Sequence, residues 1–147
     1  MQIARLNKYL SSVGIKGKLA ERVKSIHDFY SNGLKIPVAD IVVSEYLTDD
    51  GSRNYDSVWF FSPGYVMEAK RFTKDDDFDV GVLSKSVAYV QITKVDYDFV
   101  QANPKSRMAL HAAFGPADYT ITIKVSGENC DNLRDIAIKY IISNAVS

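Results

Sequence analysis

The sequence predicts an α+β fold: about seven antiparallel strands that form a barrel or a strongly curved sheet, with helices at both ends of the chain. Two runs in which apolar residues recur at every second position flank a Gly-Pro turn within residues 107–126, which is the pattern of a hairpin. Residues 129–145 follow at once, with apolar side chains at helical spacing. Residues 1–35 also have helical spacing, and extended segments fill the chain between. We therefore expect the last helix to plug the open end of the sheet.

The length and composition are those of one globular domain with its own core. The chain has 147 residues, of which 46% are hydrophobic and 12% aromatic. We expect a helical N-terminal extension over 1–35 and the barrel with its C-terminal helix over 36–147. The single cysteine, Cys130, excludes an internal disulfide. The sequence has neither a signal-peptide pattern nor an apolar run of membrane-spanning length, so we expect a soluble, cytoplasmic protein.

The formal net charge is zero, but the charges are distributed unevenly. Residues 1–35 hold seven basic and two acidic residues, whereas residues 40–79 hold four basic and ten acidic residues. A neutral chain has no general attraction to nucleic acid or to an anionic membrane. The local asymmetry indicates either two solvated faces of opposite sign or an interaction arm.

Two helices are predicted in the N-terminal extension. The apolar residues of the first recur at steps of three and four: Ile3, Leu6, Leu10 and Val13. Gly14 and Gly17 interrupt this pattern, and a second apolar stripe predicts a helix over 18–30. Ser31-Asn32-Gly33 predicts the C-terminal stop of that helix.

Extended structure is predicted after Pro37. The predicted strands are residues 38–47, 57–61, 65–72, 80–83 and 86–99. Ser62-Pro63-Gly64-Tyr65 joins the second and third strands, and it predicts a type II turn in which Gly64 has a positive φ. The apolar residues change phase near Gln91, which predicts a bulge or a bend.

The last hairpin and helix are the clearest elements in the sequence. The apolar faces of the two strands are Met108, Leu110, Ala112 and Phe114, then Tyr119, Ile121, Ile123 and Val125. The apolar stripe of the helix is Leu133, Ile136, Ala137, Tyr140 and Ile141. Asn129 is the expected N-cap of this helix.

The order of elements over residues 38–145, about seven strands followed by one helix, resembles the pleckstrin-homology-like (PH-like) barrel, and in particular the uncharacterised bacterial PH-like domains. The resemblance implies a module that binds or scaffolds. The eukaryotic lipid-binding members carry a Trp in the terminal helix, whereas the only Trp here is Trp59, in a predicted strand. Those members also bind phosphoinositides with bases on a long first hairpin loop. The tight turn at 62–65 departs from that pattern, so phosphoinositide binding is not expected.

A second, shorter resemblance lies in the N-terminal extension. Arg5-Leu6-Asn7-Lys8-Tyr9-Leu10 with Val13-Gly14-Ile15 resembles the opening of the S4 RNA-binding domain. The family continues with a Ser-Arg-Arg type run, where this chain has Lys16-Gly17-Lys18. RNA binding would use the basic side chains of this segment. The candidate contacts are Arg5, Lys8, Lys16, Lys18 and Arg22.

No catalytic, cofactor or metal site is predicted. The acidic run over 75–79 lacks the turn glycine and the late Glu of a calcium loop. His27 and His111 have no zinc-ligand spacing. Cys130 lies at a helix start but has no identifiable base. Phosphate-binding glycine loops are also absent from the sequence.

These observations lead to a non-enzymatic binding or scaffolding module, acting on a protein partner or through self-association. An open sheet edge near Val38–Leu47 could pair with a partner strand. RNA binding through the basic helices is the alternative. An enzyme with a site assembled from distant residues is left open, because a fold does not fix a function.

Overall fold

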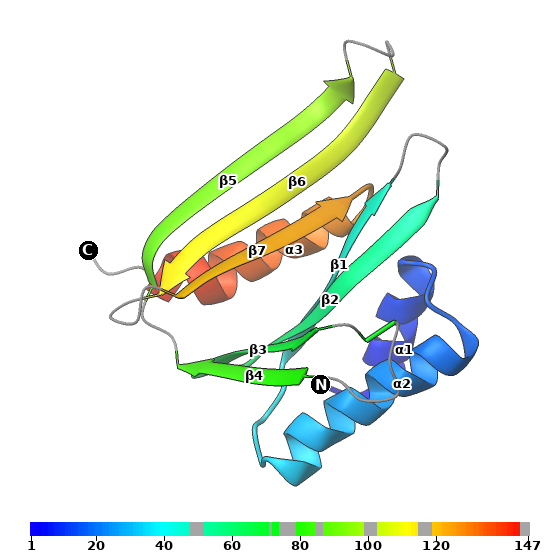
Figure 1. The fold of residues 1–147 in the computed structure, drawn as a ribbon, viewed down its shortest axis with the longest axis vertical. Helices are drawn as coiled ribbons and strands as arrows, with labels where there is room; N and C mark the ends of the chain where they lie inside the picture. Colours follow the sequence, from blue (N-terminus) through cyan, green and yellow to red (C-terminus); the bar gives the residue numbers. More distant parts are fainter. Residues whose placement is uncertain are drawn as a thin grey trace. The chain divides into compact units, whose positions relative to one another are not determined.

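The computed structural model describes residues 1–47, 52–70, 72–73, 79–84, 87–98, 103–114 and 119–144. Figure 1 shows the helices and strands. The helical elements are α1 (Ile3–Ser12), α2 (Gly17–Asp28), the π-helical turn η1 (Phe29–Gly33), α3 (Asn129–Ile136), the π-helical turn η2 (Ala137–Ile141) and the 3-10 turn η3 (Ile142–Asn144). The strands are β1 (Asp40–Leu47), β2 (Arg53–Phe61), β3 (Tyr65–Lys70), β4 (Asp79–Ser84), β5 (Val87–Asp98), β6 (Asn103–Phe114) and β7 (Tyr119–Ser126). The α+β class is confirmed.

The predicted barrel is wrong. The strands form two separate sheets, one in the order β1-β2-β3-β4 and the other in the order β5-β6-β7, and in the described part of the chain no ladder joins β4 to β5. β2 pairs with β3, β3 with β4, β5 with β6 and β6 with β7, each time antiparallel. A barrel is one closed sheet, whereas here the strands divide between two sheets. The PH-like barrel is therefore not the architecture of this chain.

Two compact units divide the chain. Unit 1 is Met1–Val43 with Asp56–Ser84, and unit 2 is Ser44–Tyr55 with Lys85–Ser147. The predicted helical extension, 1–35, falls in unit 1 together with β3 and β4. β1 and β2 each contribute one part to unit 1 and another part to unit 2.

The helices of unit 1 pack on its sheet through their apolar stripes. Leu6 and Leu10 of α1 and Val23 and Ile26 of α2 are buried, as the helical spacing predicts. Hydrogen bonds from two tyrosines fix the helices to strands. The Val43 N–H donates to Tyr9 Oη at 2.8 Å, and the Tyr30 hydroxyl donates to the Glu68 carbonyl oxygen at 2.9 Å.

The turn between β2 and β3 differs from the predicted type II turn. Gly64 is not among the described glycines with positive φ, which a type II turn requires at that position. Instead, the Tyr65 N–H donates to the Ser62 hydroxyl oxygen at 3.0 Å, and the Ser62 N–H donates to the Tyr65 carbonyl oxygen at 3.0 Å. Because the Ser62 side chain closes the turn, Gly64 does not need the left-handed conformation.

Unit 2 contains the predicted hairpin and helix, and both are confirmed. Met108 pairs with Val125, Leu110 with Ile123 and Ala112 with Ile121, and all six side chains are buried. α3 packs against β6 and β7. The helix starts at Asn129 with Glu128 at the N-cap, one residue from the predicted cap.

β5 is irregular at two places rather than at Gln91. Its pairing with β6 shifts register between Val87 and Tyr89 and again between Val95 and Tyr97, whereas Gln91 pairs regularly with His111. The change of apolar phase in the sequence therefore detects an irregular strand but misplaces the irregularity.

Among the helices that the structure describes, none combines the length and the apolar character needed to cross a membrane.

Candidate binding pocket

The backbone at the end of α2 has two unusual conformations in succession. α2 widens into the π-helical turn η1, and the Leu34 N–H donates to the Phe29 carbonyl oxygen at 2.9 Å. Lys35 then has a φ of 58°, and it is the one non-glycine residue with positive φ in the described part of the chain. The Ile36 N–H donates back to the Tyr30 carbonyl oxygen at 3.0 Å and closes the reversal. Left-handed residues commonly end helices in this way, although glycine usually takes the position.

Gly33, the predicted stop, has a different role. It lies inside η1 and does not have a positive φ. A Cβ atom built on Gly33 would lie 3.2 Å from Cδ2 of Phe29. The glycine therefore allows the Phe29 ring to lie close to the backbone, and the left-handed residue comes two positions later, at Lys35.

A pocket of about 740 Å³ lies beside this turn, between the start of α1, the end of α2, η1 and residues 35–38. We call it the η1 pocket. Its apolar lining includes Ile3, Ile36 and Val38, and its polar lining includes His27 and Asn32. The volume is within the range of pockets that hold small ligands or parts of larger ones.

His27 is the most unusual polar group of the η1 pocket. The residue is 6% exposed, and its ring lies 5.9 Å from the ring of Phe60. Nε2 has no hydrogen-bond partner among the described residues. Burial lowers the pKa of His27, and the Met1 amino group adds to this effect, while Asp28 opposes it. Buried polar atoms are normally hydrogen-bonded, so the unpaired Nε2 of a residue that lines the pocket is unusual.

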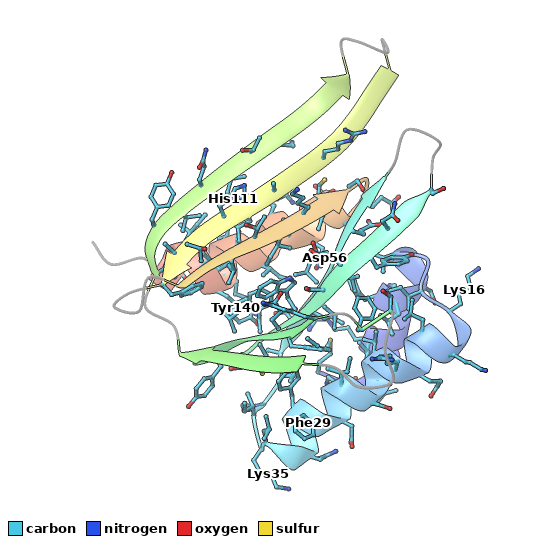
Figure 2. The ribbon with its side chains drawn as sticks, viewed as in Figure 1. Lys16, Phe29, Lys35, Asp56, His111 and Tyr140 are labelled. Atoms are coloured by element: carbon cyan, nitrogen blue, oxygen red, sulfur yellow. The ribbon has the colours of Figure 1, made fainter. Side chains whose placement is uncertain are left out.

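The other polar groups of the η1 pocket lie on η1 and next to it. The Asn32 side-chain amide donates to a carboxylate oxygen of Asp28. Ser31 and Lys35 also line the pocket. Figure 2 labels Lys35 and Phe29 at the C-terminal end of α2, where the chain leaves η1. The pocket thus combines an ammonium group, a hydroxyl and an amide with an apolar wall.

Exposed apolar side chains belong to the same region. Ile3 is 52% exposed, Phe29 43% and Leu34 42%, and they are three of the four large hydrophobic residues described as exposed in unit 1. Ile3 lines the η1 pocket, while Phe29 and Leu34 lie at the first hydrogen bond of the turn. Ile3 thus adds an exposed apolar side chain to the lining of the pocket.

The five basic residues predicted to contact RNA do not form one site. Arg5 donates to the Ala39 carbonyl oxygen at 2.9 Å and pairs with the buried carboxylate of Asp40. Nε of Arg22 is buried. Lys8, Lys16 and Lys18 are exposed. Figure 2 places Lys16 at the opposite end of α2 from Lys35. A smaller pocket, of about 360 Å³ between α1 and α2, includes only Lys16 of the five.

The other predicted features form no site in the described residues. His111 lies on β6, with Nδ1 3.1 Å from Oγ1 of Thr122. The Cys130 thiol is buried and lies 3.9 Å from the Val125 carbonyl oxygen. Residues 75–77 of the acidic run lie outside the described residues. No cluster of three His, Cys, Asp or Glu side chains suited to a metal ion is found in the ranges that the structure describes.

The edge strand predicted near Val38–Leu47 corresponds to β1, which ends its sheet. Two residues of β1 form hydrogen bonds outside the sheet, one through its backbone and one through its side chain. Tyr9 binds the Val43 N–H, and within unit 2 the Ser44 hydroxyl donates to the Lys124 carbonyl oxygen at 3.0 Å. The Lys124 N–H donates to the same hydroxyl oxygen at 3.1 Å.

A polar cluster around Glu68 was not predicted from the sequence. The Ser57 hydroxyl donates to Oε2 of Glu68 at 2.9 Å, and Nζ of Lys70 lies 3.9 Å from Oε1. Burial raises the pKa of Glu68, while the Ser57 hydrogen bond and Lys70 oppose this. Burial and the Glu68 charge raise the pKa of Tyr30. Because Tyr30 is fixed to the Glu68 backbone, the cluster positions η1 on the sheet.

The lowered pKa of His27 predicts a pH-dependent stability. The unfolded chain, with a His pKa near 6.5, binds a proton more readily than the folded chain, so the free energy of unfolding falls as the pH falls through 6.5 towards the lowered folded pKa. We expect His27→Gln to reduce this slope by at most about 1.4 kcal/mol per pH unit. Urea unfolding of both proteins at several pH values measures it. The assignment to His27 would be contradicted if the free energy of unfolding had the same pH dependence in the wild type and in His27→Gln. An equal change of this pH dependence in His111→Gln would also contradict it.

Comparisons of the chain with protein-family models, with curated proteins and with solved structures find no match.

Proposed function

We propose that this chain is a non-enzymatic binding module that takes a short segment of a partner protein into the η1 pocket. One observation supports the proposal most strongly: two uncommon backbone conformations and a buried, unpaired histidine nitrogen occur at the same pocket. π-Helical turns and left-handed non-glycine residues are both enriched at functional sites.

The occupant is proposed to be a protein segment because of the apolar surroundings. Ile36 and Val38 supply an apolar wall, and Ile3, which is 52% exposed, extends it towards solvent. A nucleic acid would instead be attracted to clustered bases, yet Arg5 is already paired with Asp40. RNA binding through Lys8, Lys16 and Lys18 is therefore the weaker candidate.

A displayed library of random peptides, selected on the intact chain, tests the proposal. We expect selected peptides to shift the amide NMR signals of residues 27–38 and to leave those of β6 unchanged. Ser31→Phe places a ring in the pocket and should weaken their binding about tenfold or more. Ser25→Phe is the matched control, since Ser25 is an exposed α2 residue outside the pocket lining.

Three results would contradict the proposal. They are a library without any selected binder, shifts confined to unit 2, and equal binding by the Ser31→Phe and Ser25→Phe variants. Shifts at 27–38 that grow with protein concentration alone would identify a second copy of the chain as the occupant instead.

A further inference from the structure

We infer that the η1 pocket recognises a carboxylate beside an apolar residue of the partner segment, and that Lys35 is the residue that binds this carboxylate. The inference rests on the proposed function and specifies the chemistry of the ligand.

The first argument is the backbone of Lys35. A left-handed conformation brings Cβ too close to the following carbonyl oxygen, a cost that glycine avoids and that asparagine offsets through local hydrogen bonds of its short side chain. The chain places glycine at the other described positions with positive φ, which are Gly14, Gly17 and Gly127. At position 35 it has lysine, although glycine or asparagine would relieve the strain. A lysine side chain at a strained position points to a use for its ammonium group.

The second argument is the set of charges around the η1 pocket. Lys35 is exposed and lines the pocket, and it appears in no described salt bridge. Asp28 is the acidic residue of the lining; its Oδ1 accepts from Asn32, and it forms no described salt bridge with Lys35. The lowered pKa leaves His27 uncharged near neutral pH. An ammonium group is thus left for an anion, with the Ser31 hydroxyl in the same lining as a further donor.

The third argument is the charge of the helical segment. Residues 1–35 have seven basic and two acidic residues. These bases do not form one contact surface, but their net positive charge acts at long range and increases the rate at which an acidic partner associates. The apolar wall beside Lys35 then favours a segment in which an acidic residue is adjacent to an aliphatic one.

Two amide-capped peptides, Leu-Glu-Val and Leu-Gln-Val, are the probes. Amide NMR titration of the intact chain should give shifts at residues 27–38 with both peptides, and binding of the Glu peptide should be about fivefold tighter. Lys35→Asn removes the charge and tolerates the left-handed backbone, so it should abolish the preference for Glu over Gln. Lys16→Asn, at the other end of α2, should retain the preference.

Lys35→Gly adds a readout that does not depend on the ligand. Relief of the left-handed strain should raise Tm by about 2–4 °C, while the preference for the Glu peptide is lost. A more stable protein with a weaker, unselective pocket is the combination expected if Lys35 binds the carboxylate.

The outcomes separate the inference from the proposed function. Equal binding of both peptides at 27–38, unaffected by the Lys35 variants, would overturn the carboxylate assignment and leave the pocket as the binding site. Shifts only outside 27–38 would overturn both. A single-stranded RNA oligonucleotide that displaced the Glu peptide and bound more tightly would overturn the assignment to a protein segment.

Discussion

Replacement of Phe60 by alanine is expected to lower the free energy of unfolding by about 3–5 kcal/mol. The Phe60 side chain is completely buried, and its ring lies 5.5 Å from the ring of Tyr30 and 5.9 Å from the ring of His27. The substitution removes the apolar contacts of Phe60 and leaves a cavity between the sheet and α2, which the rigid surroundings fill only in part.

Urea unfolding followed by Trp59 fluorescence measures this loss, since Trp59 is the only tryptophan and is buried on β2 next to Phe60. Tyr65→Ala is the control: Tyr65 is an aromatic residue of unit 1 that is 42% exposed, and its loss should cost about 1 kcal/mol or less. Equal losses for the two variants would show that Phe60 is not part of the core beneath His27.

The second large effect is expected in unit 2. Leu133 is completely buried on the face of α3 that packs against β6 and β7. Leu133→Ala should lower the free energy of unfolding by about 2–5 kcal/mol. Urea unfolding followed by far-UV circular dichroism measures the change.

Ile138→Ala is the matched control for Leu133→Ala. Ile138 belongs to the same helical segment but is 56% exposed, so its replacement should change the free energy of unfolding by no more than about 0.5 kcal/mol. A loss at Ile138 as large as that at Leu133 would mean that the helix buries a different face from the one assigned here.

The parts of the fold that could be predicted are those in which local pattern and local packing agree. Ile121, Ile123 and Val125 alternate with polar residues, and they are buried because the adjoining helix covers that face. The prediction of a barrel is wrong for a related reason. Alternation indicates that one face of a strand is buried, but it does not indicate which element covers it.

The η1 pocket could not be predicted, because it depends on contacts between distant residues. Ile3, His27 and Val38 come from three elements, and no local motif connects them. The position of the left-handed residue in the turn is also predicted wrongly. Gly33 suggests the left-handed stop, yet the Phe29 ring occupies the space beside Gly33, and the reversal occurs at Lys35. The sequence marks the helix end correctly but not the residue that is strained.

The interleaving of the two units has a consequence for synthesis on the ribosome. Unit 1 can be completed once residue 84 has left the exit tunnel, whereas residues 44–55 belong to a unit whose other part, 85–147, is translated later. This twelve-residue stretch is therefore synthesised before the rest of unit 2. During that interval the nascent chain would expose residues 44–47 of β1 and 53–55 of β2, while residues 40–43 of β1 and 56–61 of β2 are already packed in unit 1.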